Sequence, residues 1–417
     1  MTAGAGEHYD DLETRSADER TRWIAEALPR QIANAKTNAP AYARLLADVD
    51  PAAIRSPADL AALPVTRKAA LVAAQAEDPP FGGYVARPVH EFDHIFQSPG
   101  PIYEPGMVRR DWWRLGRFAF AAGVRTGDIV QNTFAYHLTP AGMMFENAAR
   151  AVGATSIPAG TGQTELQVRA AAAAGATAYA GTPDYLKIIL EKADELGVRL
   201  AIDKALVGGG ALFPSLRQYY AERGIRCLQC YATADLGNIA YESEAMEGMI
   251  VDEGVIVEIV RPGTGDPVPE GEVGEVVVTT FNPDYPLIRF ATGDLSAVMP
   301  GQSPCGRTNM RIRGWMGRAD QTAKIKGMFV RPEQVAELVA RFPEVHRARV
   351  IVERSPDERD VMTVALELDR EALSGADPER YGKTVAEILK LKGTINLVEK
   401  GSLPNDGKVI DDRREYG

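Results

Sequence analysis

A single carboxylate, Asp294, follows an apolar run that has the composition of a β-strand. The run covers residues 287–290, and the next four residues have the sequence ATGD. We expect the strand to stop there, which leaves the carboxylate at the edge of a sheet, where Gly293 lets a ligand approach closely. A carboxylate accepts two hydrogen bonds at once, so Asp294 suits a ligand with two donors. The alternative is an aspartate that caps a helix or closes a turn.

The chain changes character soon after Asp294. Residues 317–320 (GRAD) precede a basic segment with Lys324 and Lys326, and beyond Gly327 the composition is that of a new, smaller folding unit. A ligand-holding carboxylate just before a domain junction is typical of an enzyme whose small domain moves over its large one.

Two more segments carry residue types that suit ligand binding or catalysis. Glycines 208–210 follow a strand-like run and let the backbone approach a flat ligand, for which Tyr231 offers a stacking face. The alternative is an ordinary turn between strand and helix, with Tyr231 in the core. Lys408 stands in a glycine-containing tail, where most lysines are simply solvated.

The order and spacing of these motifs resemble those of the adenylate-forming superfamily of acyl-CoA synthetases. The motifs are TGD at 292–294, GRAD at 317–320 and LPNDGK at 403–408. Toward the N-terminus, residues 39–42 (APAY) and 54–68 (IRSPADLAALPVTRK) are similar to the phenylacetate-CoA ligase branch. The resemblance covers nearly the whole chain. It implies an ATP-dependent, AMP-forming ligase that joins a carboxylic acid to coenzyme A through an acyl-adenylate.

The resemblance also implies roles for individual residues. Asp294 would hold the ribose hydroxyls of ATP, assisted by Arg318 or, as a weaker candidate, Arg307. Lys408 would bridge carboxylate and α-phosphate oxygens as charge builds up, a role often worth about 10²–10³ in rate. The small domain would then rotate about Asp320 and open the way for the thiol. The other residues expected to bind ATP or AMP are Gly209, Gly210, Ala211, Tyr231, Ala232 and Thr233.

The acid would bind after the strand expected at 128–133 and around positions 180 and 236. The mixture of aromatic, small and polar side chains there suggests a modest pocket for an aryl or short hydroxylated acid. His137 is almost as well explained as a loop histidine with no part in binding. The expected lining residues are Phe134, Tyr136, His137, Ala180, Gly181, Leu236 and Gly237.

The chain departs from the family pattern at the expected magnesium ligand. Relatives have a Tyr-Gly-x-Ser/Thr-Glu motif whose hydroxyl and carboxylate serve the phosphates and Mg²⁺. Here residues 231–235 are YATAD, so Asp235 keeps the charge on a side chain one methylene shorter, and Thr233 brings its hydroxyl one position early. Asp235 is therefore the candidate ligand for Mg²⁺.

The larger departure is at residues 98–105 (SPGPIYEP). Relatives have a Ser/Thr/Gly-rich loop there, usually ending in Lys-Pro, which wraps the β- and γ-phosphates. Pro99 and Pro101 have no N–H to donate, and Glu104 adds negative charge where the phosphates would lie. Losing two hydrogen bonds to a charged group would cost roughly 3–6 kcal/mol. Either other groups compensate, or activity is weak, or the segment now serves structure or another substrate contact.

The pattern of apolar residues predicts a layered α/β protein. Residues 9–48 are expected to be helical, and Thr66 to cap a helix that begins near Lys68. Crossover helices between strands imply a parallel sheet from residue 111 to 240. The predicted helices there are 111–122, 140–151, 165–174, 183–196 and 214–223, and the predicted strands are 128–132, 154–158, 178–180, 204–208 and 225–230.

Two later regions complete the predicted fold. Residues 249–300 alternate as antiparallel strands joined by Gly/Pro turns, and the tail after 321 has the order β-α-β-β-α-β. We therefore predict a large N-terminal domain with parallel and antiparallel sheets over residues 1–319. A small α+β cap domain that carries the catalytic lysine would cover residues 320–417.

Composition limits the possible partners. The chain has 417 residues, 45% of them hydrophobic, which is ample for two cores. Its net charge of −10 and the lack of a long Lys/Arg run argue against nucleic acid as a partner. The N-terminus has no signal-peptide core and no stretch is apolar enough for a membrane span, so we expect a cytoplasmic protein. Family habit favours a homodimer.

The cysteines were weighed as redox or metal ligands. Cys227 and Cys230 have CxxC spacing but lie in a strand-like segment without a second pair, so we predict buried structural thiols. Cys305 stands alone, which does not support a metal cluster.

Three functions remain open from the sequence. The first is the AMP-forming acid–CoA ligase, and the second is an adenylating enzyme that passes the acyl group to an amine, a carrier-protein thiol or another acceptor. The third is a non-catalytic binding protein, which the altered phosphate segment would explain. Retention of Lys408, Asp320 and Asp294 counts against the third.

Overall fold

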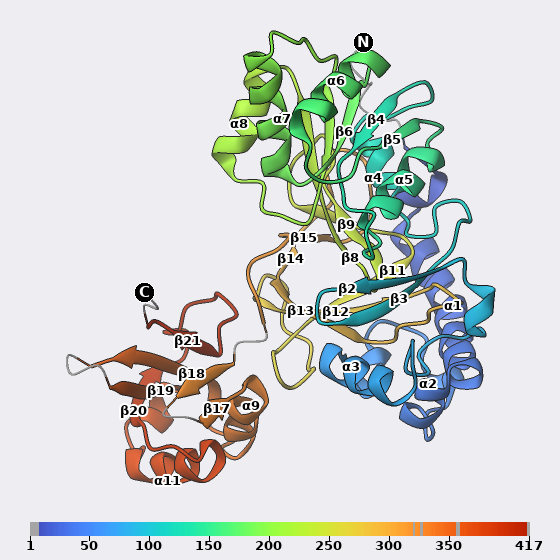
Figure 1. Ribbon diagram of the computed structural model, residues 1–417. Helices are drawn as coiled ribbons and strands as arrows, with labels where there is room; N and C mark the ends of the chain where they lie inside the picture. The colour runs from blue at the N-terminus through green and yellow to red at the C-terminus, as the bar shows by residue number, and fades with distance from the viewer. Residues whose placement is uncertain (1–7, 320–321, 326–327, 356–358, 415–417) are drawn as a thin grey trace. The chain divides into compact units, whose positions relative to one another are not determined.

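The chain falls into two units, and each is described by itself. Figure 1 shows the computed structural model, which describes residues 8–319, 322–325, 328–355 and 359–414. Unit 1 comprises Met1–Val257, Val278–Thr292 and Met299–Gly314, and unit 2 comprises Glu258–Val277, Gly293–Val298 and Trp315–Gly417. Asp320, the expected hinge, lies outside the described residues, so the division of the chain between residues 319 and 320 stays a prediction.

Unit 1 contains the α/β layers predicted from the sequence. Its helices are α1 (Ala17–Asn38), α2 (Pro40–Leu45), α3 (Lys68–Glu77), α4 (Gly116–Ala121), α5 (Ala141–Ala151), α6 (Thr164–Ala174), α7 (Pro183–Glu195) and α8 (Pro214–Glu222). Its strands are β1 (Thr66–Arg67), β2 (His94–Ser98), β3 (Ile102–Gly106), β4 (Ile129–Asn132), β5 (Thr155–Pro158), β6 (Ala178–Gly181), β7 (Lys204–Val207), β8 (Arg226–Thr233), β9 (Gly237–Tyr241), β10 (Met249–Val251) and β15 (Arg311–Ile312).

The largest sheet is parallel in one half and antiparallel in the other. Its order across unit 1 is β15-β10-β9-β8-β7-β6-β4-β5. The strands from β5 to β8 pair in parallel, because each is followed or preceded by a crossover helix. Strands β9, β10 and β15 continue the sheet in antiparallel fashion. The predicted α/β class with both kinds of sheet is confirmed.

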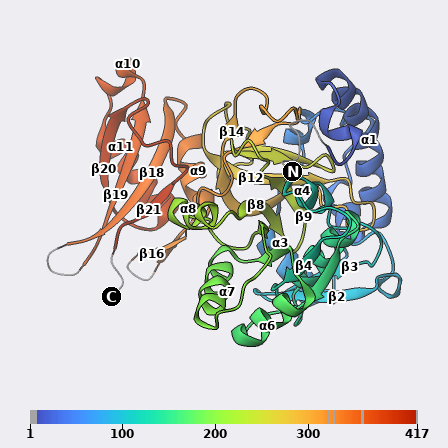
Figure 2. The same cartoon turned by 90° about the horizontal axis from the view of Figure 1, so that it is seen from above.

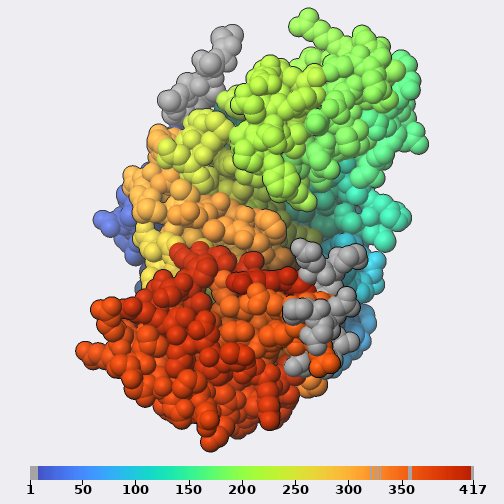
Figure 3. Space-filling model, turned by 90° about the vertical axis from the view of Figure 1, so that its left-hand side faces the viewer, coloured from blue at the N-terminus to red at the C-terminus, as the bar shows by residue number. Residues whose placement is uncertain are grey.

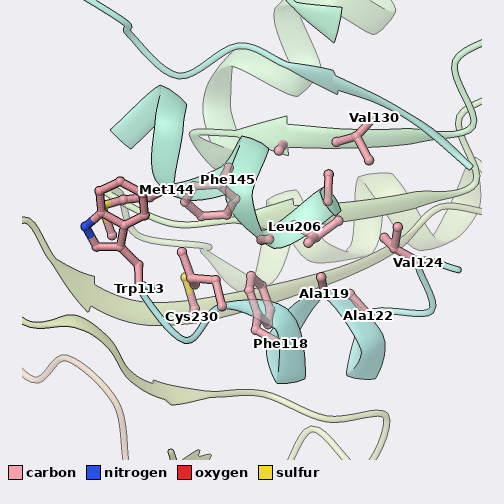
Figure 4. Packing of buried hydrophobic residues seen from close by; sticks show 14 of the residues in the cluster. Trp113, Phe118, Ala119, Ala122, Val124, Val130, Met144, Phe145, Leu206 and Cys230 are labelled. Carbon is pink, nitrogen blue, oxygen red and sulfur yellow. The ribbon is translucent and has the colours of Figure 1, made fainter. Parts of the chain in front are cut away.

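Alternation along the parallel strands buries both faces of this sheet. Ala178, Leu206 and Leu228 pack with α4 and α5, and their neighbours Tyr179 and Ala205 pack with α6, α7 and α8. Figure 1 shows these two groups of helices on opposite sides of the strands. Figure 4 shows the α4–α5 side, where Phe118 and Phe145 lie over the sheet. Strands buried on both faces are typical of parallel sheets.

Two helix predictions need correction. The predicted helix at 111–122 begins only at Gly116, because Asp111 and Arg114 have φ values of 53° and 60°, outside the right-handed helical region. Thr66 does not cap α3, since it lies in β1 and donates its hydroxyl to the carbonyl of Ile288 at 3.0 Å. Arg67 occupies the N-cap position, and its side chain makes no hydrogen bond that caps the helix.

A four-stranded sheet contains the segment around Asp294. Its order is β1-β13-β12-β11, with β11 at Val255–Val260, β12 at Gly274–Thr280 and β13 at Phe290–Ser296. The predicted strand at 287–290 is wrong in its bounds, because Arg289 has a φ of 44° and interrupts the extended backbone. β13 begins at Phe290 and runs through Asp294, which therefore lies inside a strand and not at its end.

Residues 98–105 form part of a β-hairpin, and whether this segment binds phosphates stays open. Strands β2 and β3 pair antiparallel, with Ser98 opposite Ile102 and Phe96 opposite Glu104. Pro99 and Pro101 occupy the turn, where a missing N–H costs no ladder hydrogen bond.

Unit 2 is an α+β layer built on one four-stranded sheet. Its elements are β14 (Val298–Met299, at the boundary with unit 1), β16 (Ala323–Ile325), β17 (Met328–Val330), α9 (Pro332–Ala340), β18 (Val345–Arg354), β19 (Asp360–Leu368), α10 (Arg370–Leu373), α11 (Pro378–Leu389), β20 (Thr394–Glu399) and β21 (Ile410–Asp412). The sheet order is β20-β19-β18-β21. The predicted β-α-β-β-α-β order is present, with β16 added before it and β21 after it.

One face of the β18–β21 sheet carries the core of unit 2. Val350, Val364 and Leu366 point to the side where Leu338 of α9 and Val385 of α11 pack. Figure 2 shows α9 beside β18, and the orange-to-red residues in Figure 3 show this C-terminal part as one continuous body. Arg347, Arg349 and Glu367 alternate with these apolar residues and therefore face the other side.

Every helix within the described ranges is too short or too polar to cross a membrane.

A buried ion pair holds the N-terminal segment of unit 1. Arg307 donates from Nε to Glu13 Oε1 at 2.5 Å, and the Tyr241 hydroxyl donates to the same oxygen at 2.6 Å. Glu13 and Arg307 are each only 1% exposed. Arg307, the weaker candidate for contact with ribose, therefore has a structural partner deep in unit 1.

We predict that Glu13→Gln lowers the free energy of unfolding by about 3 kcal/mol, because it leaves the Arg307 charge buried without its partner. Thermal or denaturant melting measures the loss. The matched control is Glu244→Gln, since Glu244 lies 3.7 Å from the same arginine but its side chain is 39% exposed. That control should change stability by about 0.5 kcal/mol or less. Equal effects of the two substitutions would contradict the assignment.

Candidate active site

Strand β8 carries the central tyrosine of the candidate site. Up to Gln229, β8 pairs in parallel with β7, and a bulge between Tyr231 and Ala232 interrupts its antiparallel pairing with β9. The Tyr231 ring is buried, and its hydroxyl donates to Thr292 Oγ1 at 2.9 Å. Bulges often turn side chains toward functional sites. Tyr231 thus joins the end of β8 to the residues that precede Asp294 in the sequence.

The glycine turn after β7 is open. Gly209 has a φ of 67°, a conformation that side-chain-bearing residues rarely adopt, and Gly209, Gly210 and Ala211 are all exposed. The nearest atom to a Cβ built at Gly209 is Phe134 Cε1, at 3.7 Å. The backbone at this turn is therefore accessible to a flat ligand, and Phe134 lies beside it.

Several expected acyl-pocket residues are tightly packed. Phe134 stacks on Phe145 with ring centroids 4.2 Å apart. A Cβ at Gly181 would lie 2.0 Å from Thr133 Oγ1, and one at Gly237 would lie 2.7 Å from the carbonyl oxygen of Trp113. These glycines are required by close packing, whether or not an acid lies nearby.

The remaining acyl-pocket candidates differ in exposure. Ala180 and Leu236 are buried, and His137 is exposed. Tyr136 is half-buried, accepts a hydrogen bond from Asn132 Nδ2 at 2.8 Å and donates to Glu146 Oε2 at 3.2 Å. Burial and the Glu146 charge raise the pKa of Tyr136, so it is a neutral donor and acceptor. The acyl pocket as a whole stays a prediction.

Asp235, the expected Mg²⁺ ligand, lies at the turn between β8 and β9. It is 6% exposed, and its Oδ2 forms an ion pair with Lys68 Nζ at 2.9 Å. Neither oxygen of Asp235 accepts a well-directed hydrogen bond from the described part of the chain. Thr233 is occupied locally, since its Oγ1 accepts the N–H of Leu236 at 3.2 Å. Ala232 is half-buried beside it.

Glu104 of the hairpin faces this aspartate. It is 1% exposed, and its Oε1 accepts a hydrogen bond from Ser98 Oγ. Burial, followed by the negative charge of Asp235, raises the pKa of Glu104 to about 8. Tyr285 is also buried nearby, and its pKa is raised by burial and by the charges of Asp235 and Glu104. Two carboxylates and one lysine therefore share a buried cluster in unit 1.

The candidate ribose site lies in unit 2. Asp294 Oδ1 accepts hydrogen bonds from Arg318 Nη1 at 3.0 Å and from the indole Nε1 of Trp315 at 3.1 Å. Asp294 and Arg318 lie opposite each other in an antiparallel bridge, which explains how residues 24 positions apart meet. From the sequence we expected Arg318 to assist Asp294 in holding the ribose, which stays a prediction, and we did not expect a part for Trp315.

Lys408 lies in a loop that two buried charged residues hold in place. Arg349, 2% exposed, forms a two-pronged ion pair with Asp406 and donates to the Pro404 carbonyl at 3.1 Å. Glu367, 1% exposed, accepts the N–H of Leu403 at 2.6 Å. The loop is therefore anchored to the face of the β18–β19 sheet that does not carry the helices.

The Lys408 side chain itself is half exposed. Its Nζ donates to Asp411 Oδ1 at 3.3 Å, and it lines a cavity of about 200 Å³ in unit 2 with Arg261 and Glu272. Burial alone would raise the pKa of Asp411, but hydrogen bonding from Arg413 and the charge of Lys408 keep it below its usual value. An exposed ion pair of this kind is weak, so the lysine can exchange partners.

Sequence reasoning missed Lys68, Trp315, Arg349 and Glu367 as members of these sites. Lys68 could have been found, because it is the last residue of the 54–68 motif. Trp315, Arg349 and Glu367 belong to no motif that the sequence showed. The thiols were predicted correctly, since Cys227 and Cys230 are buried and unpaired and burial raises the pKa of each to about 12. No group of three or more His, Cys, Asp or Glu side chains in the described ranges is arranged to hold a metal ion.

Solved structures share this fold. The 2-hydroxyisobutyryl-CoA ligase in complex with 2-HIB-AMP and CoA, in the thioesterification state, matches 97% of this chain and 92% of its own with a TM-score of 0.69 and 24% identity. The same ligase in the postadenylation state matches 96% of this chain and 91% of its own, with a TM-score of 0.70 and 24% identity. The fold is that of the AMP-forming CoA ligases.

Curated relatives of this chain are phenylacetate-coenzyme A ligases. The phenylacetate-coenzyme A ligase of Thermus thermophilus is 30% identical over 331 residues, 75% of this chain and 73% of the relative. That of Aromatoleum evansii is 28% identical over 397 residues, 91% of this chain and 88% of the relative. A comparison with models of protein families gives no match. The chain belongs to the phenylacetate-coenzyme A ligase family.

We predict that Glu104 makes stability depend on pH. Between an ordinary glutamate pKa of 4.5 and the raised value of about 8, the folded chain keeps a proton that the unfolded chain has lost. Stability should therefore fall as the pH rises through this window, by roughly 4–5 kcal/mol. Melting in EDTA at several pH values measures this loss.

Glu104→Gln removes the titrating group and should flatten the pH dependence, so its advantage over wild type grows from about pH 5 to about pH 8. The exposed Glu91→Gln is the control and should follow wild type, since the side chains of Glu91 and its ion-pair partner Arg87 are 43% and 42% exposed. Parallel curves for wild type and Glu104→Gln would show that Glu104 does not titrate in this window.

Proposed function

We propose that this protein is an ATP-dependent, AMP-forming ligase that joins an aryl or small carboxylic acid to coenzyme A. The observation that carries the proposal is the 30% identity to a phenylacetate-coenzyme A ligase over 75% of the chain. The anchored Lys408 loop and the Asp294–Arg318 pair support it, because these groups match the chemistry of adenylation.

In the first step, a carboxylate oxygen of the acid would attack the α-phosphorus of ATP. An O–P bond forms, the bond from the α-phosphorus to the bridging oxygen breaks, and pyrophosphate leaves. Asp294 would hold the ribose hydroxyls, Tyr231 the adenine face and the turn at Gly209 the edge of the base. Lys408 would bridge the acid and the α-phosphate as negative charge builds up.

In the second step, the thiol of coenzyme A would attack the acyl carbon of the acyl-adenylate. A C–S bond forms, the bond from the acyl carbon to the phosphate oxygen breaks, AMP leaves and the thiol proton passes to solvent. Lys408 would not be needed here, and the C-terminal domain that carries its loop would move away by rotation about Asp320.

Asp235 fits the Mg²⁺ that accompanies ATP. Both of its oxygens are buried and accept no well-directed hydrogen bond in the described part of the chain. Buried oxygens of this kind are expected where a cation binds. Mg²⁺ usually takes one or two carboxylates and completes its shell with phosphate oxygens and water. When bound, the ion would neutralise charge on the phosphates, and Asp235 would hold it at the end of β8.

We predict that Lys408→Ala lowers adenylation by about 10²–10³-fold, because it removes the charge that stabilises the transition state. Acid-dependent exchange of pyrophosphate into ATP, over a panel of aryl and short hydroxy acids, measures the effect and identifies the acid. Lys400→Ala is the control, since Lys400 is an equally exposed lysine of unit 2 that pairs with Asp369 at 3.6 Å. Full exchange in Lys408→Ala, or no exchange with any acid in wild type, would contradict the proposal.

We also predict that Arg349→Met lowers kcat for adenylation roughly 10- to 100-fold without raising the KM for ATP, because it frees the loop that positions Lys408. Arg347→Met is the matched control on the same face of β18, since half-buried Arg347 donates to the Pro404 carbonyl at 3.2 Å, whereas Arg349 also forms the ion pair with Asp406. A similar loss in both variants, or a loss that appears in KM, would show that Arg349 does not act by positioning.

The acceptor is tested in the same assays. Exchange with an acid but no thioester in the presence of coenzyme A would favour an amine or a carrier-protein thiol as acceptor. We further propose a cytoplasmic homodimer, which fractionation of cells and light scattering of the purified protein examine directly.

A further inference from the structure

The cluster at Glu104 has more acidic groups than basic groups. Two buried carboxylates, Glu104 and Asp235, face one cation, Lys68, whose Nζ lies 2.9 Å from Asp235. If both carboxylates are ionised, the three groups carry a net charge of −1. A buried uncompensated charge is costly, so the cluster must take up a proton or a cation.

The cluster also holds oxygens with unused hydrogen-bonding capacity. Glu104 Oε2, Asp235 Oδ1 and the Tyr285 hydroxyl are buried and have no hydrogen-bond partner in the described ranges. The three side chains are 1%, 6% and 2% exposed. They lie close enough for the charges of both carboxylates to raise the pKa of Tyr285. Buried polar atoms are rarely left without partners unless a ligand or ordered water completes them.

We propose that Glu104 and Asp235 together hold one divalent cation of the Mg²⁺ or Mn²⁺ class in the free enzyme, before any nucleotide binds. The inference rests on the proposed function and deepens it. The resemblance implies only Asp235 as a ligand, whereas Glu104 comes from the β2–β3 hairpin that replaces the phosphate-wrapping loop. Hard oxygen ligands on two adjacent carboxylates suit these ions.

This arrangement compensates for the altered hairpin. With Glu104 protonated the three groups carry no net charge, and a divalent cation that displaces this proton brings the net charge of the cluster to +1, so the cluster then attracts a triphosphate. Lys68, whose side chain is 36% exposed, is the group nearest solvent and can turn from Asp235 to a phosphate once the cation is in place. The prolines of the hairpin tip then no longer need to donate hydrogen bonds.

The test is a titration of the full-length, nucleotide-free protein with Mn²⁺, followed by electron paramagnetic resonance of the free ion and by the shift in melting temperature. Wild type should show one saturable site per chain and a higher melting temperature with Mn²⁺. Glu104→Gln and Asp235→Asn should each weaken binding roughly 10-fold or more. Glu91→Gln, an exposed glutamate of the same unit, should bind as wild type does.

Two results would overturn the inference: no saturable site in wild type, or Mn²⁺ binding by Glu104→Gln as tight as that of wild type. The wild-type titration decides the first even if a variant fails to fold. Pyrophosphate exchange, measured in parallel, separates this inference from the proposed function. Exchange without a nucleotide-free metal site removes the inference alone, and a metal site without exchange removes the proposed function alone.

Discussion

Strand β8 must satisfy neighbours that run in opposite directions, and the candidate site depends on this constraint. Its first residues complete a parallel sheet with β7, while its later residues pair antiparallel with β9. The parallel pairing ends at Gln229, which leaves Tyr231 and the turn at Asp235 beyond the carboxyl end of β7. Ligands of open α/β sheets bind at such ends. The bulge at Tyr231 therefore marks the end of the regular sheet and the start of the candidate site.

The hairpin β2–β3 differs from the family pattern both in the hydrogen-bond donors that it lacks and in the carboxylate that it carries. Its turn prolines cannot donate hydrogen bonds to phosphates, yet the same hairpin brings Glu104 near enough to Asp235 for the aspartate charge to raise the pKa of Glu104. Neighbouring side chains of a strand point to opposite faces, so Glu104 and Tyr103 of β3 lie on different faces of the hairpin. Glu104 is buried, whereas Tyr103 is half-buried. The departure from the family pattern is thus a change in the chemistry of the site as well as a loss of donors.

The two faces of the β18–β21 sheet in unit 2 have different roles. Apolar residues of β18 and β19 pack under α9 and α11, and the charged residues that alternate with them hold the loop of Lys408. A catalytic lysine must be mobile enough to exchange partners but must return to one place. Buried anchors at Arg349 and Glu367, together with a half-exposed Lys408 side chain, meet both requirements of the catalytic role proposed for Lys408.

The sequence by itself determined the α/β class, the succession of helices and strands from 128 to 230 and the buried thiols. These follow from local periodicity and from short motifs, which need no knowledge of distant contacts. The start of β13 and of α4 could not be predicted, because the left-handed backbone at Arg289, Asp111 and Arg114 leaves no mark in apolar periodicity.

Only the tertiary structure decided which polar groups meet. Arg349 and Glu367 alternate with apolar residues, which from the sequence alone predicts that they face solvent. They are buried because a loop 36 or more residues away in the sequence covers them. Glu104, Asp235 and Lys68 come from a hairpin, a turn and a helix start that are far apart in the chain. Periodicity fixes which side of an element a residue occupies, but long-range packing fixes what lies opposite it, and that contact sets charge, pKa and ligand.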